Sequence, residues 1–184
     1  MEVILAPGAS GNAASMRRHV DGLSARGVPA RAIDLPVRKA ETAIEAYAAA
    51  AGDLAGRVIG GQSYGGRVAS LLAAAAAAPT SATSPVAGPE GLVLFSYPLH
   101  RPGAPDRVDR TLHWPAIQRP ILFLSGESDP FARIDLLRAA IGDLLPQAQL
   151  VTWPRLGHSL TSVLDETLDV VAAFVRGLEA PPRA

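Results

Sequence analysis

A serine flanked by glycines at a fixed spacing is the sharpest chemical signal in the sequence. Gly61-Gln62-Ser63-Tyr64-Gly65 reads G-x-S-x-G, with an apolar strand-like run before it and a helical pattern after it. This strand–turn–helix setting is typical of a nucleophile elbow, whose tight turn strains the serine and excludes side chains two positions to either side. The pattern predicts Ser63 as a nucleophile. The alternative is a glycine-rich turn whose serine has no catalytic role.

An elbow serine needs a base and an acid, in the chain order serine, aspartate or glutamate, histidine. Asp129 follows the apolar run Ile121–Ser125, and His158 follows the run Gln149–Trp153. Because the carboxyl ends of parallel strands gather at one edge of a sheet, we expect both side chains to meet Ser63 there. The sequence therefore predicts a triad in which Ser63 attacks, His158 transfers the proton and Asp129 orients the imidazole.

Other residues compete for the acid and base roles. Asp129 precedes a proline and could instead form an Asp-Pro turn or cap a helix. Glu127 lies two positions earlier and is a rival acid. Among the histidines, only His158 follows the last expected strand. The others lie inside an expected helix or in an irregular segment, and they are His19, His100 and His113.

Two backbone N–H groups must stabilise the oxyanion that forms during acyl transfer. One belongs to Tyr64, the residue after the nucleophile, and the other comes from the loop after the first strand. That loop, Pro7–Asn12, is small and glycine-rich, and Ala9 is its expected donor. The alternative is a simple glycine turn capped by Ser10 or Asn12. A phosphate loop fits poorly, because no Gly-Lys-Ser/Thr follows.

Short apolar runs alternate with longer helical patterns, which is typical of a parallel sheet covered by helices. The expected strands are Glu2–Ala6, Ala30–Leu35, Arg57–Gly60, Gly91–Ser96, Ile121–Ser125 and Gln149–Trp153. The expected helices span about Ala13–Ala25, Ala40–Leu54, Tyr64–Ala77, Arg133–Leu144 and Leu160–Leu178. Most of these strands are continuously apolar, as strands covered on both faces should be. The run Ala30–Leu35 alternates instead, so we expect it at an edge.

Two segments interrupt this pattern. Pro79–Pro89 has the composition of a surface loop. Leu99–Arg119 is long, rich in proline and arginine, and without clear periodicity. One hypothesis is that it forms a rim over Ser63 that contacts the substrate; the other is a crossover whose tryptophan packs against the sheet. The rim side chains would be Tyr97, His100 and Trp114.

Composition limits the remaining classes of protein. The 184 residues suit one domain spanning 1–184, and 48 % hydrophobic against 18 % charged residues argues against disorder. Seventeen basic and seventeen acidic residues give a net charge of zero, which predicts neither nucleic acid nor an anionic membrane as a partner. With no cysteine and four scattered histidines, we expect no metal site. We find no targeting signal and no apolar stretch approaching about 20 residues, so we expect a cytoplasmic protein.

Five motifs together carry a family resemblance. They are Leu5-Ala6-Pro7-Gly8-Ala9-Ser10-Gly11, the elbow from Gly61 to Arg67, Tyr97-Pro98-Leu99-His100-Arg101-Pro102-Gly103, Asp129-Pro130-Phe131 and Gly157-His158-Ser159. From Leu5 to about Leu160 the chain resembles the α/β-hydrolases. In particular it resembles the small hydrolase-like family typified by testis-expressed protein 30 and the hydrolase-like domain of NSL complex subunit 3. The tyrosine-proline-leucine-histidine element is the most family-specific of the five.

Two positions depart from that family's pattern. Pro7 replaces a histidine and Arg101 replaces a proline. Because proline has no N–H, Pro7 cannot donate to an oxyanion, whereas Ala9 can.

The resemblance implies a minimal α/β-hydrolase fold, with a mainly parallel six-stranded sheet, helices on both faces and no large cap domain. Together with the residues above, it implies a carboxylesterase-like serine hydrolase that cleaves a small acyl ester without a cofactor. Some relatives are subunits of complexes, so the rival function is a non-catalytic interaction module with the same fold. The acyl group, the leaving group and the oligomeric state are left open.

Overall fold

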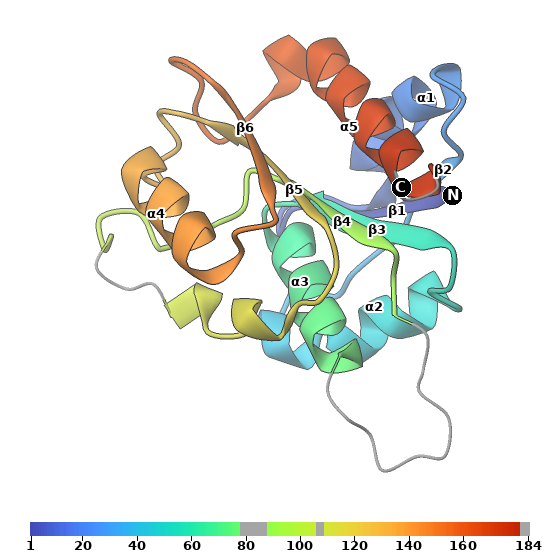
Figure 1. Ribbon diagram of the computed structural model, residues 1–184, viewed down its shortest axis with the longest axis horizontal. Helices are drawn as coiled ribbons and strands as arrows, with labels where there is room; N and C mark the ends of the chain where they lie inside the picture. The colour runs from blue at the N-terminus through green and yellow to red at the C-terminus, as the bar shows by residue number, and fades with distance from the viewer. Residues whose placement is uncertain (78–87, 106–108, 181–184) are drawn as a thin grey trace.

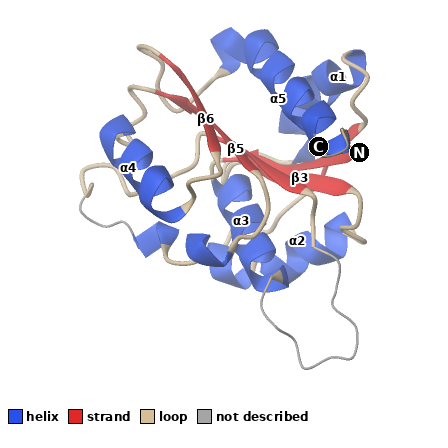
Figure 2. Ribbon diagram, in the orientation of Figure 1, coloured by secondary structure: helices blue, strands red, loops and turns tan. Residues whose placement is uncertain are grey.

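A computed structural model of the chain describes residues 1–77, 88–105 and 109–180. In these ranges six strands form one fully parallel sheet in the order β2-β1-β3-β4-β5-β6 (Figures 1 and 2). The strands are β1 (Glu2–Ala6), β2 (Ala30–Ala32), β3 (Arg57–Gln62), β4 (Gly91–Phe95), β5 (Ile121–Gly126) and β6 (Gln149–Trp153). Each expected strand is therefore confirmed, and β2 lies at an edge as expected.

The edge strand β2 is shorter than the sequence predicts. The alternating run extends to Leu35, but pairing with β1 ends at Ala32. Asp34 instead accepts a hydrogen bond from the backbone N–H of Ala13 (2.7 Å). Pro36 then has no N–H to donate to a ladder. The chain therefore leaves the sheet before the end of the apolar pattern.

The helices follow the expected order. They are α1 (Arg17–Ala25), α2 (Ile44–Ala51), α3 (Tyr64–Ala76), α4 (Ile134–Leu144) and α5 (Leu164–Glu179). Short 3₁₀ turns precede three of them, at η1 (Ala13–Met16), η2 (Ala40–Thr42) and η5 (Thr161–Val163), and two more, η3 (Asp109–Thr111) and η4 (Trp114–Ala116), lie between β4 and β5. Most of the expected loop Pro79–Pro89 lies outside the described residues. Within them, the connections add no cap domain to the sheet and its helices.

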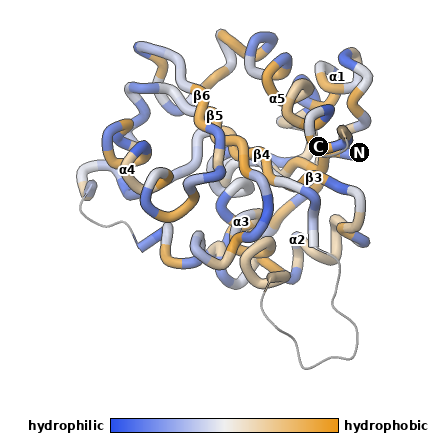
Figure 3. Tube along the Cα trace, viewed as in Figure 1, coloured by the Kyte–Doolittle hydropathy of each residue, from blue (hydrophilic) through white to orange (hydrophobic). Residues whose placement is uncertain are grey.

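Successive side chains of each strand face opposite sides of the sheet, so each strand contributes to two cores. Ile4 and Ile59 pack with α2, α3 and α4 on one face. Val3 and Val58 pack on the other face with residues of α1 and α5. Figure 1 shows these two helices together on one side of the sheet. Figure 3 shows hydrophobic residues gathered along the central strands. Burial on both faces explains why these strands are continuously apolar in sequence.

The strand order brings the chemically important loops to one edge. From β1 the chain passes through α1 to β2, and from β3 it passes through α3 to β4 on the other side of the sheet. Loops that diverge in this way leave a crevice at the carboxyl ends of the two strands. The loops after β5 and β6 open at the same edge, because all the strands are parallel. No helix in the described ranges is long and apolar enough to cross a membrane.

Candidate active site

The turn between β3 and α3 holds Ser63 in a conformation that residues with a side chain rarely adopt, with φ +48° and ψ −108°. A Cβ atom at Gly61 would lie 2.2 Å from the carbonyl oxygen of Ala6, and one at Gly65 would lie 2.4 Å from the same oxygen. Both distances are far shorter than van der Waals contact, so both positions require glycine. The Ser63 N–H donates to the Phe95 carbonyl (2.8 Å). Backbone strain of this kind costs about 1–3 kcal/mol and clusters at functional sites.

Ser63 faces a cleft of about 450 Å³ at the carboxyl edge of the sheet. The loop after β1, the elbow, and the loops after β5 and β6 all contribute to its wall. The lining residues are Gly8, Ala9, Ser10, Gly11, Ser15, Gln62, Ser63, Phe131 and His158. A volume of this order accommodates a small organic ligand. The structure thus brings the predicted nucleophile and the predicted base to one cavity.

Asp129 and His158 form a hydrogen-bonded pair beside this cleft. His158 Nδ1 lies 2.8 Å from Asp129 Oδ2, and the other carboxylate oxygen accepts the Phe131 N–H (2.8 Å). The Asp129 side chain is fully buried, whereas a quarter of the His158 side chain is exposed. The Phe131 ring packs against the imidazole with a centroid separation of 4.5 Å. Since Nδ1 faces the carboxylate, Nε2 is the ring nitrogen left to exchange a proton with another group.

The rival acid, Glu127, has other partners. Its Oε1 accepts hydrogen bonds from Thr152 Oγ1 and Arg138 Nη2, both at 2.8 Å. These partners lie on β6 and α4. Glu127 therefore ties a helix to a strand, and Asp129 is the carboxylate that contacts His158.

The loop after β1 brings Ala9 to the cleft. The Gly11 N–H donates to the Gly8 carbonyl (3.0 Å), which closes a tight turn around Ala9. The Gly65 N–H donates to the Pro7 carbonyl (3.1 Å), which ties this loop to the start of α3. Pro7 thus takes part through its carbonyl oxygen, so this contact does not need the N–H that proline lacks.

Tyr64 opens α3, and the first N–H groups of a helix have no partner within the helix. Its side chain points elsewhere, since the hydroxyl donates to the Pro36 carbonyl (2.9 Å). The capping alternative for the loop after β1 also holds, because Asn12 Oδ1 accepts the Ser15 N–H (3.1 Å) at the start of η1. The cap and the turn around Ala9 coexist in the same loop.

The expected substrate rim does not match the burial of its side chains. Tyr97, His100 and Trp114 are 1 %, 2 % and 0 % exposed, and none is among the residues that line the cleft. Trp114 packs against Phe123 of β5 with a centroid separation of 5.1 Å, and its Nε1–H donates to the Tyr97 hydroxyl (3.3 Å). Large aromatic surfaces gain most from such burial. The observed packing is the crossover alternative; residues 106–108 of this segment lie outside the described ranges.

His100 forms hydrogen bonds to the loop that carries Asp129, a role that the sequence did not predict. The backbone N–H of His100 donates to the Phe131 carbonyl, and the ring nitrogen Nε2 accepts the backbone N–H of Arg133, both at 3.0 Å. An accepting Nε2 leaves the proton on Nδ1, which donates to the Arg101 carbonyl (2.9 Å). One indication of this contact was the order of the strands, because the segments that carry His100 and Asp129 follow the neighbouring strands β4 and β5.

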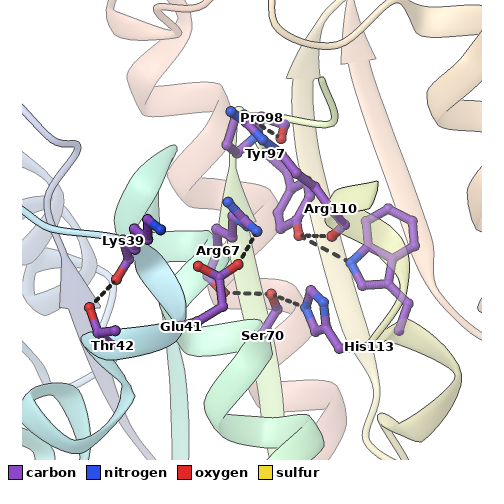
Figure 4. Close-up of polar contacts among 10 residues, drawn as sticks. Lys39, Glu41, Thr42, Arg67, Ser70, Tyr97, Pro98, Arg110 and His113 are labelled. Atoms are coloured by element: carbon purple, nitrogen blue, oxygen red, sulfur yellow. Dashed lines mark hydrogen bonds and ion pairs between the residues drawn. The ribbon is translucent and has the colours of Figure 1, made fainter. Parts of the chain in front are cut away.

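The two remaining histidines lie outside the cleft. His113 Nε2 is 2.8 Å from Ser70 Oγ of α3 (Figure 4). Burial and then the positive charge of Arg67 lower the pKa of His113 to about 4. His19 packs edge-on against Phe95, with a centroid separation of 5.1 Å. Neither imidazole lines the cleft of Ser63.

Comparison with solved structures finds the same fold in several proteins, among them an esterase and a lipase. TT1662 from Thermus thermophilus superposes with a TM-score of 0.75 at 19 % identity, over 98 % of this chain and 90 % of that chain. Esterase B from Lactobacillus rhamnosis gives 0.73 at 15 % identity, over 97 % and 77 %. A monoacylglycerol lipase from Paleococcus ferrophilus gives 0.73 at 14 % identity, over 96 % and 94 %. At these identities the likeness concerns the fold.

Sequence comparison is more selective. No curated protein sequence matches the chain. A family model does match, and its description is "Alpha/beta hydrolase domain". The match runs from residue 3 to residue 170 and so spans most of the sheet, its helices and the cleft. The chain therefore belongs to the α/β-hydrolase family.

Proposed function

We propose that this hydrolase is a carboxylesterase-like enzyme that cleaves a small acyl ester through Ser63, His158 and Asp129. The observation that carries the proposal is the meeting of a strained serine and a carboxylate-backed imidazole at one cleft. Among the proteins of similar fold, one is named an esterase and another a monoacylglycerol lipase, which favours ester substrates here. The enzyme would be a single cytoplasmic domain that needs no cofactor.

The reaction would follow two steps. Ser63 Oγ attacks the ester carbonyl while His158 Nε2 accepts its proton, and the same nitrogen then protonates the departing alcohol. Water, activated by the same base, hydrolyses the acyl-serine. Asp129 keeps Nδ1 protonated and stabilises the imidazolium that forms in each step. The buried position of Asp129 and its hydrogen bond from the Phe131 N–H hold the carboxylate in place for this role.

The oxyanion would be stabilised by the backbone N–H groups of Ala9 and Tyr64. Ala9 lies in a tight turn that is bonded to the start of α3, and Tyr64 is the first residue of that helix. Fixed donors need no reorganisation during the reaction, and each commonly contributes about 10²–10³ in turnover. The hydrogen bond from Gly65 to Pro7 supports the proposal, because it fixes the relative position of the two donor segments.

The narrower family of testis-expressed protein 30 and NSL complex subunit 3 is also a proposal, supported by the five motifs given above. It keeps a rival function open, that of a non-catalytic interaction module. An interaction module has no need of a strained serine backbone or of a buried carboxylate behind a cleft histidine. Both features are therefore better explained by catalysis.

Covalent labelling with a fluorophosphonate probe tests the proposal, because the probe reacts with an activated serine. We expect stoichiometric labelling of the wild type and of Ser70→Ala, and no labelling of Ser63→Ala. Ser70 is the matched control, since its hydroxyl also contacts a histidine. An unlabelled but folded wild type would favour the interaction module instead.

A further inference from the structure

A second, smaller cavity of about 110 Å³ adjoins the cleft. It lies between the carboxyl ends of β3 and β4 and the beginnings of α1 and α5. The residues that line it are Ser15, Arg18, His19, Gln62, Phe95, Ser96, Leu160, Thr161 and Leu164. Ser15 and Gln62 line both cavities, and Gln62 directly precedes Ser63. A substrate held at Ser63 is therefore within a short reach of this cavity.

The lining of the small cavity is polar and carries positive charge. Six of the nine lining residues have polar side chains, and among the described residues no aspartate or glutamate lines it. Arg18 supplies the charge, and within the described ranges its guanidinium has no ion-pair partner. Its neighbour Arg17 differs, because it pairs with Asp21 and does not line the cavity. An anionic group is the ligand that such a lining favours.

His19 adds an unsatisfied hydrogen-bonding group to the same cavity. Its Nδ1 is buried and has no hydrogen-bond partner. Nearly all buried polar atoms in proteins have a partner, so an exception calls for a ligand or a water molecule. Burial, followed by the charge of Arg18, lowers the pKa of His19 to about 4, so the imidazole is neutral at physiological pH and carries one N–H. A carboxylate oxygen accepts such a hydrogen bond well.

The backbone at the far wall of the cavity is strained. Ser96 is buried and has φ +49°, a value that residues with a side chain seldom adopt. Its N–H donates to the Leu124 carbonyl (2.7 Å), which fixes it at the end of β4. Strain of this kind tends to occur where a ligand is bound. The volume has room for several water-sized groups, so a carboxylate fits.

We propose that this cavity is a subsite for a carboxylate that the substrate carries a few bonds from its scissile carbonyl. Arg18 and His19 would bind the carboxylate, while Ser63 attacks the ester in the adjoining cleft. This inference rests on the proposed function and narrows its substrate class to anionic esters. The carboxylate could belong to the acyl group or to the alcohol, and matched substrates distinguish the two.

Hydrolysis of matched ester pairs provides the first test. On the acyl side, methyl hydrogen glutarate is compared with methyl pentanoate; on the alcohol side, carboxymethyl butyrate is compared with ethyl butyrate. We expect wild-type kcat/KM to favour the charged member of one pair by about tenfold or more, mainly through KM. The pair that shows this preference identifies the side that carries the carboxylate.

Variants assign that preference to the cavity. Arg18→Gln should bring the ratio of charged to neutral kcat/KM close to one, and His19→Phe should lower it as well. Arg17→Gln is the matched control, because it removes the neighbouring charge outside the cavity and should keep the wild-type ratio. Thermal unfolding of each variant checks the fold. If His19→Phe unfolds, His19→Gln keeps a hydrogen-bonding side chain of similar reach and takes its place.

A binding measurement separates this inference from the proposed function. Glutarate is titrated into the protein while the imidazole resonances of His19 are followed by NMR. We expect a saturable shift in the wild type and in Arg17→Gln, and a much weaker one in Arg18→Gln. If neutral esters are cleaved but the charge preference and the shift are both absent, the cavity holds water only and the inference is wrong. If the shift occurs but no ester is cleaved, the carboxylate site stands and the esterase proposal fails.

Discussion

Helix α3 places a serine near a histidine at two points of the molecule. Ser63 precedes its first residue and faces the cleft that His158 also lines. Ser70 lies about two turns further along, fully buried, with its Oγ 2.8 Å from His113 Nε2 (Figure 4). The contact between Ser70 and His113 has the length of a hydrogen bond between a serine and its base. We nevertheless assign the chemistry to the other pair.

The surroundings of the two pairs explain this choice. The Ser70 hydroxyl donates to the Arg67 carbonyl (2.8 Å), so its proton is already engaged within the helix. Partial burial of His113 and the positive charge of Arg67 both oppose protonation of its imidazole. His158 instead has the buried carboxylate of Asp129 2.8 Å from its Nδ1, which orients the ring and fixes its tautomer. A nucleophilic serine thus needs access, a strained turn and charge behind its base, and a short contact to histidine does not supply these.

The largest expected effect comes from removing each serine hydroxyl in turn. Ser63→Ala should lower ester hydrolysis by about 10⁴–10⁶, since the rest of a triad contributes little without its nucleophile. Ser70→Ala should stay within about tenfold of wild type in turnover and lose about 1–2 kcal/mol in unfolding free energy, because a buried hydrogen bond is lost. Steady-state kinetics and urea unfolding measure both. Activity of Ser63→Ala within about tenfold of wild type would remove the nucleophile assignment.

The carboxylate behind the base is the next feature to change. Asp129→Asn should reduce turnover by about 10⁴, because the amide cannot stabilise the imidazolium and favours the wrong tautomer. Glu127→Gln is the matched control, and it should change turnover little, since Glu127 binds Thr152 and Arg138. Measured kcat values rank the two variants. The opposite ranking would transfer the acid role to Glu127.

Substitution of Trp114 tests whether the segment between β4 and β5, which carries His113, has a structural role. Trp114→Ala should lower the unfolding free energy by about 3–5 kcal/mol, because it leaves a large cavity against Tyr97 and Phe123. Relative rates among esters of graded acyl length should not change, since the indole does not line the cleft. An altered chain-length preference at unchanged stability would restore the substrate rim.

The fold and the site differ in how far the sequence predicts them. Continuous apolar runs predict most of the strands, because a strand covered on both faces is rich in apolar residues, and the alternating run Ala30–Leu35 predicts the edge strand β2. The glycines around Ser63 are equally informative, since Cβ atoms at Gly61 and Gly65 would collide with the Ala6 carbonyl. Chain order then predicts the pairing of Asp129 with His158, because parallel strands deliver their following loops to one edge.

The segment between β4 and β5 is where sequence reasoning fails. It lacks periodicity, so nothing in the sequence indicates which of its residues face the core. Its burial is decided by tertiary contacts, such as Trp114 on Phe123 and His100 on Phe131 and Arg133. The small cavity was also beyond reach, because its lining comes from four separate segments of the chain.

The smallest expected effect is a pH dependence of stability that arises from His113, whose imidazole is partly buried. The folded protein holds the pKa of His113 near 4, whereas the unfolded chain has the usual value of 6.5. Between these values the unfolded state binds more protons than the folded state. The contribution of His113 to the unfolding free energy is therefore fully present above pH 6.5 and is lost as the pH falls towards 4.

Substitution of His113 isolates its share of this dependence. The loss is at most about 1.4 kcal/mol per pH unit for each such histidine, and partial exposure of the ring makes it smaller. His113→Asn should therefore flatten the dependence of unfolding free energy on pH between 6.5 and 4, as measured by urea unfolding. Some slope should persist, because the pKa of His19 is lowered in the same direction. Identical slopes in wild type and His113→Asn would mean that His113 is protonated as easily in the folded protein as in the unfolded chain. Its contact with Ser70 would then resemble a catalytic pair more closely than we infer.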